Sequence, residues 1–191
     1  MIYQEKIFSK EECDLIIDFA NRYKDIPVKP RTFEIQEKNR IVHPSDFFMQ
    51  YYVYKIPIDD STVWVFDKLI EWFKSVTNIK LLDNFESKLI STLHCYKEND
   101  GFGKHIDLGP GFENRRYNVG IQLNEDYHGG NYICWDKDKN EILISKERGT
   151  VLCYHSEIEH EIQKITGGVR WSLVATITKE MIVNHNKPKM L

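Results

Sequence analysis

The chain has 191 residues, of which 41% are apolar and 13% aromatic, and its formal net charge is −3. This composition is typical of a globular protein and excludes wholesale disorder. The slightly negative charge gives no reason to expect nucleic acid as a partner. Because no apolar run is long enough to span a membrane and the N-terminus lacks an apolar signal stretch, we expect no membrane association and a cytoplasmic location.

A chain of this length is most simply one domain, residues 1–191. We expect residues 1–87 to form a support layer of helices and strands, and residues 88–178 to form the core that carries the site. The four cysteines are widely spaced and include no CxxC pair, which predicts buried, reduced thiols. These cysteines are Cys13, Cys95, Cys134 and Cys153.

Two helices are predicted in the N-terminal half. Ser9 and Glu12 have the spacing of a capping box, and apolar residues then follow at helical spacing, so we expect a helix from about residue 9 to residue 23. Its apolar positions are Leu15, Ile16, Phe19 and Ala20. A second helix is expected over residues 62–76, with Val63, Phe66, Leu69, Ile70 and Phe73 on its buried side.

Residues 26–58 alternate in polarity and contain three prolines, which predicts short strands and loops. The charged stretch Glu34–Arg40 is expected to form a mobile flap.

From residue 88 onward the apolar period changes to two, which indicates strands. The strand-like runs are 89–96, 118–123, 131–135, 141–144, 150–155, 161–165 and 169–178. Many short strands separated by Gly, Asn and Asp favour a sandwich or jelly roll, with the preceding helices covering one outer face. We therefore predict a mainly β protein, α+β by content.

The alternation also assigns the faces of two strands. Tyr96, His94 and Thr92 share the inward face of one strand, and Arg170, Ser172, Val174 and Thr176 share one face of another. An arginine on an inward face is costly unless an anion meets it.

His105 and Asp107 lie two residues apart, so on a strand or at its end they project to the same side. With a histidine from a distant strand, they could hold one face of a ferrous ion and leave three positions open. His160 and His155 compete for the third place, since an inward face of Val151, Cys153 and His155 would bring His155 to the site.

Several segments resemble the prolyl 4-hydroxylase-like 2-oxoglutarate/Fe(II) dioxygenases. They are 95–107, 160–172, Leu123-Asn124 and Tyr127–Gly130, with a weaker echo at 8–13, so that the resemblance covers about residues 90–178. It implies a double-stranded β-helix with Fe(II), 2-oxoglutarate and dioxygen as cofactors, and ascorbate as a possible reductant. It also implies that His105, Asp107 and His160 bind the metal; His155 would then lie near the metal or in the substrate pocket.

By the same resemblance, Arg170 binds the C5 carboxylate of 2-oxoglutarate, and Tyr96 either contacts the co-substrate or only packs. Where the relatives carry tyrosine before Leu-Asn, this chain has Gln122, so a familiar phenol donor is missing. Ser172, on the same face as Arg170, could replace its hydrogen bond, and Gln122 could supply another.

The resemblance implies hydroxylation of an unactivated C–H bond, and the presence of Asp107 favours hydroxylation over halogenation. By family analogy the substrate is a prolyl residue in a peptide or protein; the alternative is a free amino acid or small metabolite. A non-catalytic metal- or ligand-binding jelly roll is the hypothesis from another class. Substrate-pocket candidates are His94, His155, Arg115 and Arg116, with loops 28–50 and 108–116. The oligomeric state is left open.

Overall fold

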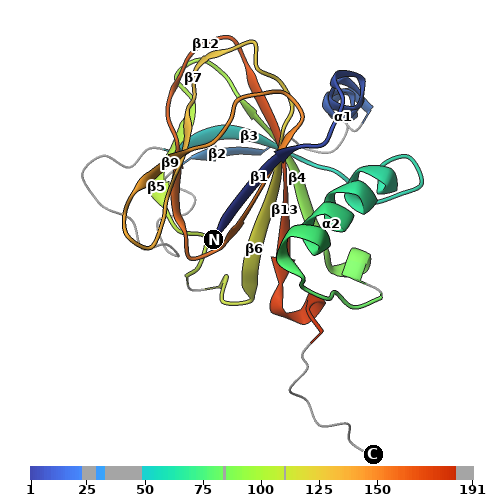
Figure 1. Ribbon diagram of the computed structural model, residues 1–191. Coiled ribbons are helices and arrows are strands. Elements are labelled where there is room, and N and C mark those ends of the chain that lie inside the picture. The colour runs from blue at the N-terminus through green and yellow to red at the C-terminus, as the bar shows by residue number, and fades with distance from the viewer. Residues whose placement is uncertain (23–28, 33–48, 84, 110, 184–191) are drawn as a thin grey trace, which may run out of the picture.

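The computed structural model describes residues 1–22, 29–32, 49–83, 85–109 and 111–183. Figure 1 shows strands wrapped around an interior, with two helices on one outer side. Eleven of the described strands pair as one continuous antiparallel sheet, which curls into a double-stranded β-helix, or jelly roll, with two four-stranded layers facing each other. The fold class is therefore the one that the sequence predicts.

The first layer follows the order β10-β6-β13-β4, and the second follows the order β5-β11-β8-β9. Their bounds are β10 Thr150–His155, β6 Arg115–Gln122, β13 Arg170–Thr178, β4 Ile90–Tyr96, β5 Gly101–His105, β11 Glu159–Ile162, β8 Tyr132–Trp135 and β9 Glu141–Leu143.

The remaining strands extend or join these layers. β1 (Ile2–Lys6) pairs with β10 at the edge of the first layer. β3 (Met49–Lys55) pairs with both β4 and β5, so it carries the hydrogen bonding from one layer to the other, and β2 (Lys29–Thr32) pairs with β3. β7 (His128–Gly129) and β12 (Ile165–Gly167) form a small separate pair.

Helix α1 (Lys10–Arg22) begins at the predicted capping box. The Ser9 backbone N–H donates to the Glu12 carboxylate at 2.7 Å, and the Glu12 N–H donates to the Ser9 hydroxyl at 3.2 Å. Each side chain thus satisfies a backbone donor that the first helical turn leaves without a partner.

Helix α2 (Val63–Thr77) ends at Asn78, whose φ of 57° is the left-handed conformation common at helix C-termini. Two short 3₁₀ helices complete the described elements, η2 (Phe85–Lys88) and η3 (Lys179–Met181).

The main core lies between the helices and the outer face of the first layer. α2 contributes Phe66, Leu69, Ile70 and Phe73 to it. The strands contribute alternate residues, among them Leu93, Val119, Ile121, Leu173, Ala175 and Ile177. The period of two therefore divides these strands into an outer face that packs on helices and an inner face that looks into the barrel.

Some predicted details differ from the structure. Leu15 is 48% exposed, and Cys13 takes the buried place on α1; Val63 is only half-buried. The predicted strand 161–165 is instead β11, which ends at Ile162, followed by β12. The alternation did not predict β1, and the flap expected at 34–40 lies outside the described residues.

The predicted inward face of β10 is wrong. Val151 and Cys153 belong to the outer core, and Thr150, Leu152 and Tyr154 line the interior. Because β10 is buried on both faces, its hydrophobic pattern does not distinguish them.

All four cysteines are free and buried, as predicted. Burial raises the pKa of the Cys13 and Cys95 thiols to about 11, and that of Cys134 and Cys153 to about 12, so all four stay protonated near neutral pH. No helix in the described part of the chain is both long and apolar enough to cross a membrane.

Candidate functional site

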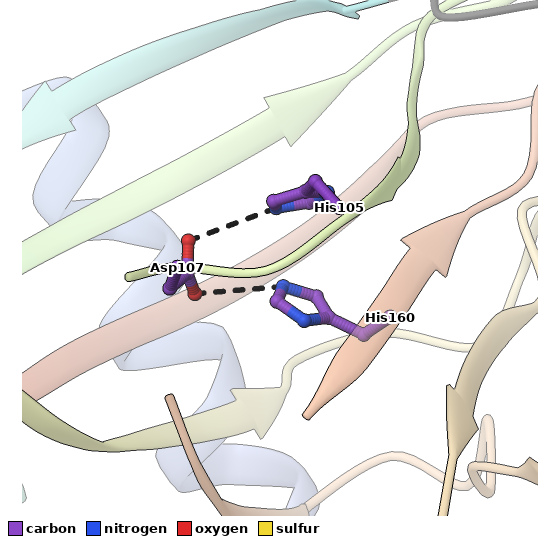
Figure 2. A group of neighbouring side chains, drawn as sticks. All are labelled: His105, Asp107 and His160. Carbon is purple, nitrogen blue, oxygen red and sulfur yellow. Dashed lines mark ion pairs between the residues drawn. The ribbon is translucent and has the colours of Figure 1, made fainter. Parts of the chain in front are cut away.

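Two neighbouring strands bring together three potential metal ligands. His105 on β5 and His160 on β11 are paired directly across the ladder, and their ring centroids are 4.2 Å apart. Asp107 follows β5, where its backbone N–H donates to the Ser156 carbonyl at 3.0 Å. Figure 2 shows both imidazoles directed at the Asp107 carboxylate. One ligand atom from each of the three residues lies within 4.8 Å of the others.

The backbone fixes the tautomer of both imidazoles. His105 Nδ1 lies 2.7 Å from the Gly103 carbonyl oxygen, and His160 Nδ1 lies 2.9 Å from the Ile158 carbonyl oxygen. A carbonyl can only accept, so each Nδ1 carries a proton and donates it, which leaves Nε2 as the nitrogen that can offer a lone pair to a cation. Both Nε2 atoms face Asp107, at 3.7 Å for His105 and 3.5 Å for His160. The two Nε2 atoms and the Asp107 carboxylate are therefore placed to bind one cation together.

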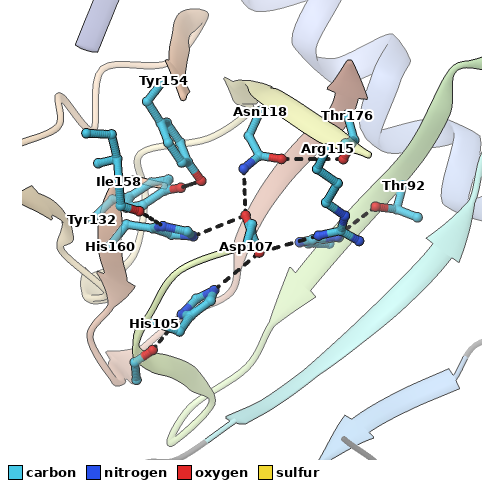
Figure 3. A network of polar contacts seen from close by, with 12 residues as sticks. Thr92, His105, Asp107, Arg115, Asn118, Tyr132, Tyr154, Ile158, His160 and Thr176 are labelled. Atoms are coloured by element: carbon cyan, nitrogen blue, oxygen red, sulfur yellow. Dashed lines mark hydrogen bonds and ion pairs between the residues drawn. The ribbon is translucent and has the colours of Figure 1, made fainter. Parts of the chain in front are cut away.

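Polar contacts also orient the Asp107 carboxylate. Asn118 donates from Nδ2 to Asp107 Oδ2 at 2.6 Å, and Arg115 Nη1 lies 3.5 Å from Oδ1. Thr176 Oγ1 donates in turn to Asn118 Oδ1 at 3.4 Å. Figure 3 shows this chain of contacts converging on Asp107 from β6 and β13. Hydrogen bonds of this kind hold a ligating carboxylate in one rotamer.

The triad faces a cavity between the two layers, and Arg170 lies in the wall of the same cavity. The Arg170 side chain is only 1% exposed. Its Nη1 donates to Ser172 Oγ at 3.1 Å, and its Nη2 donates to Gln122 Oε1 at 2.8 Å. Its buried Nε has no hydrogen-bond partner. Among the described residues no carboxylate lies within ion-pair distance of Arg170, so no anion in the described part of the chain neutralises this buried cation.

A tyrosine that the strand pattern did not single out supports this arginine. The Tyr127 hydroxyl accepts from Gln122 Nε2 at 2.5 Å, which directs Gln122 Oε1 toward Arg170. Burial raises the pKa of Tyr127, and the nearby Arg170 charge opposes that rise. Gln122 and Tyr127 thus form a hydrogen-bonded amide and phenol beside Arg170.

Asn124 fixes the backbone on both sides of the arginine. Its Oδ1 accepts from the Trp171 N–H at 2.7 Å, and its Nδ2 donates to the Val169 carbonyl at 2.7 Å. This explains why the Leu-Asn pair lies so close to the site: Asn124 locks the start of β13 in position.

Tyr96 and His94 line the cavity from β4. The Tyr96 ring stacks on Tyr51 with centroids 4.9 Å apart, and the Arg170 Cζ lies 5.2 Å from the Tyr96 ring centroid. His94 Nε2 lies 2.8 Å from the Thr92 hydroxyl. The inward assignment of Thr92, His94 and Tyr96 is therefore confirmed, and Arg115 also lines the cavity.

Two predicted pocket residues lie elsewhere. His155 Nδ1 faces the Glu157 carboxylate at 3.5 Å, and its ring packs edge-on against Tyr117. Arg116 donates to the backbone carbonyls of Glu113 and Arg115. Neither His155 nor Arg116 is among the cavity-lining residues, so their positions give no support to a role in the pocket.

The residues close to the site that were not predicted for it include Asn118, Tyr127, Tyr132 and Tyr154. Tyr154 was missed because the wrong face of β10 was predicted to point inward. Asn118 could have been predicted, because it lies on the same face of β6 as Gln122 by period-two alternation.

The residues fit the expected cofactors on two independent grounds. Two imidazoles and one carboxylate on the same side are the ligand set of non-haem ferrous oxygenases, which leaves positions open on the metal. The unpaired guanidinium in the same cavity is suited to a carboxylate of a co-substrate.

Comparison with known proteins agrees. Residues 91–177 match the family described as the 2OG-Fe(II) oxygenase superfamily. No curated protein matches the sequence. The fold is similar to that of a prolyl-4-hydroxylase from Pseudomonas putida, with a TM-score of 0.68, 16% identity, and coverage of 93% of this chain and 92% of that one.

A prolyl hydroxylase from Trichoplax adhaerens, solved with a peptide fragment of the hypoxia inducible factor oxygen degradation domain, gives a TM-score of 0.70 at 14% identity. The match covers 94% of this chain and 83% of the other. These matches and the His105, Asp107 and His160 site together support a 2OG-Fe(II) oxygenase that uses Fe(II), 2-oxoglutarate and dioxygen and has a fold like that of prolyl 4-hydroxylases.

Proposed function

We propose that His105, Asp107 and His160 hold the Fe(II) ion, and that Arg170 receives the C5 carboxylate of 2-oxoglutarate. The observation that carries this proposal is the buried Arg170 guanidinium, which shares a cavity with the triad and has no carboxylate partner among the described residues. A paired guanidinium and carboxylate in this setting would offset the cost of burying either charge alone. Residues 1–191 would then act as one catalytic domain.

Each residue has a defined task in this proposal. The two Nε2 atoms bind as neutral donors because the Gly103 and Ile158 carbonyls keep the protons on Nδ1. Asn118 keeps the Asp107 carboxylate turned toward the imidazoles. When bound, Fe(II) with 2-oxoglutarate and dioxygen supplies the oxidative decarboxylation that drives hydroxylation of a C–H bond.

The C5 carboxylate of the co-substrate would meet only hydrogen-bond donors. Arg170 offers its charge and its free Nε, and Ser172 and Gln122 already hold the two terminal nitrogens in place. Since the guanidinium is planar and fixed, it favours a carboxylate over a neutral group. The Tyr96 ring lines this end of the cavity, with its centroid 5.2 Å from Arg170 Cζ.

For the substrate we propose a prolyl residue in a peptide or protein. The support is the similarity of the fold to two prolyl hydroxylases, one of them solved with a peptide fragment. The inner wall near the triad carries His94 and Arg115, which could meet the backbone carbonyls of such a peptide.

The test is turnover of protein reconstituted with Fe(II) and 2-oxoglutarate under air. Succinate should form in step with oxygen incorporation into prolyl-containing peptides, measured by mass spectrometry, and peptides with alanine in place of proline should gain no oxygen. If only free amino acids or small metabolites gained oxygen, the peptide assignment would fall and the oxygenase assignment would stand. Absence of 2-oxoglutarate binding would instead leave a ligand-binding jelly roll.

A further inference from the structure

A pair of hydrogen-bonded tyrosines lies inside the cavity. Tyr132 from β8 and Tyr154 from β10 place their hydroxyl oxygens 2.6 Å apart, so the contact joins the second layer to the first across the interior. Both side chains line the cavity. The neighbouring wall is aliphatic, formed by Ile144, Leu152 and Ile162. The two phenols thus form a hydrogen-bonded polar pair beside these aliphatic side chains.

The pair lies beside the metal end of the cavity. The Tyr154 ring centroid is 4.8 Å from that of His160, and the Tyr132 ring centroid is 5.9 Å from it. Arg170 Cζ lies 5.8 Å from the Tyr132 ring on the other side. Tyr132 therefore flanks the path from Arg170 to the triad, and Figure 3 shows the two hydroxyls meeting beside the His160 ring.

A count of hydrogen bonds shows a spare donor. Two phenols carry two O–H groups, and their mutual contact uses one of them. For the other O–H, the hydrogen bonds among the described residues include no acceptor. A buried hydroxyl without a partner is costly, so a donor kept in an apolar wall indicates a ligand that accepts from it.

We propose that the Tyr132–Tyr154 pair is a co-substrate-binding element whose spare O–H donates to the keto-acid end of 2-oxoglutarate, at its C1 carboxylate. This inference rests on the proposed function, in which the co-substrate extends from Arg170 to the metal. The Arg170 end already has Ser172 and Gln122 as polar neighbours, whereas the pair lies beside the His160 ring at the metal end. The pair would therefore complete the polar contacts of the co-substrate at its other end.

The competing explanation is a purely structural bridge between the two layers. Both explanations predict some loss of thermal stability when the hydroxyls are removed. Only a binding role predicts a weaker affinity for a keto acid that lacks the C5 carboxylate, because such a ligand cannot use Arg170.

The experiment compares wild type with Tyr132→Phe, Tyr154→Phe and the double variant, each loaded with Fe(II) without oxygen. Calorimetry measures the dissociation constants of 2-oxoglutarate and of 2-oxopentanoate, which keeps the keto-acid end and lacks the C5 carboxylate. We expect the double variant to bind both ligands on the order of 10-fold more weakly, the size of one hydrogen bond to a charged group. Each single variant, which keeps one hydroxyl, should fall between.

Tyr54→Phe is the matched control, since Tyr54 packs against Trp171 outside the cavity and its loss should leave both constants unchanged. Unchanged affinity in the double variant, with only a lower Tm, would overturn the inference while the proposed function stood. A loss confined to 2-oxoglutarate would also overturn it, because the pair would then serve the C5 end. If wild type bound neither keto acid, the proposed function itself would fall.

Should the double variant fail to fold, the metal-to-ligand absorption band of the two single variants decides. A shift of that band with both keto acids supports the inference, and an unshifted band contradicts it.

Discussion

The two faces of the first layer are built from the same strands and have opposite tasks. On β13, Ala175 and Ile177 face outward into the helix-covered core, whereas Arg170, Ser172 and Thr176 face the cavity. The outer face stabilises the fold because it buries apolar area. The inner face lowers that stability, because it holds polar groups out of water. Alternation lets one short segment stabilise the fold and carry the chemistry without either task restricting the other.

The largest effect is expected at the metal end of the inner face. His160→Ala should eliminate succinate formation because one of three proposed ligands is lost. His155→Ala is the matched control: its side chain pairs with Glu157 away from the cavity, so we expect near wild-type turnover. A coupled succinate assay separates the two. Loss of turnover in His155→Ala with retention in His160→Ala would show that the ligand set is wrongly assigned.

A substitution on the outer face should instead lower the stability of the protein and leave the binding of 2-oxoglutarate unchanged. Ile177→Ala removes a fully buried side chain from the core and should lower the free energy of unfolding by about 2–5 kcal/mol. Thr176→Val, one residue away on the cavity face, should change stability far less. Urea unfolding measures both variants. Normal 2-oxoglutarate affinity is expected for folded Ile177→Ala; a changed affinity would mean that the two faces are coupled.

A smaller effect is expected where the inner face orients a ligand. Asn118→Ala removes the donor to Asp107 Oδ2 and should weaken Fe(II) binding by about 10–100-fold, the usual cost of losing such a contact. Asn114→Ala, which removes an exposed contact to Glu180, serves as the control. Anaerobic Fe(II) titration gives the result, and equal affinities for the two variants would remove Asn118 from this role.

The smallest effect on stability is expected in helix α1, which helps to cover the outer face. Ser9→Ala breaks the capping box of α1 and should cost about 1 kcal/mol of stability. Ser145→Ala, at an exposed site outside the helices, is the comparison. Thermal unfolding measures the loss, and the affinity for 2-oxoglutarate should not change. An effect on affinity would mean that α1 contributes more than support.

The sequence predicted features that depend on local patterns. The capping box of α1 and the alternation on β4 and β13 follow from residue spacing alone, and they placed Tyr96 and Arg170 on the inner face. The sequence could not resolve β10, whose two faces are both apolar, and so it did not find Tyr154. Tyr127 was missed for another reason: its role depends on a contact with Gln122 that no period encodes.

The most direct test of the central claim is 2-oxoglutarate binding to Arg170→Leu, measured by anaerobic calorimetry with Fe(II) present. We expect binding to be nearly abolished, and Arg170→Lys to be markedly weaker than wild type because lysine keeps the charge and loses the planar fork. Fe(II) affinity should change little in either, and Arg116→Leu, outside the cavity, should behave as wild type. An unchanged dissociation constant for 2-oxoglutarate in Arg170→Leu would contradict the co-substrate assignment and most of the proposed reaction with it.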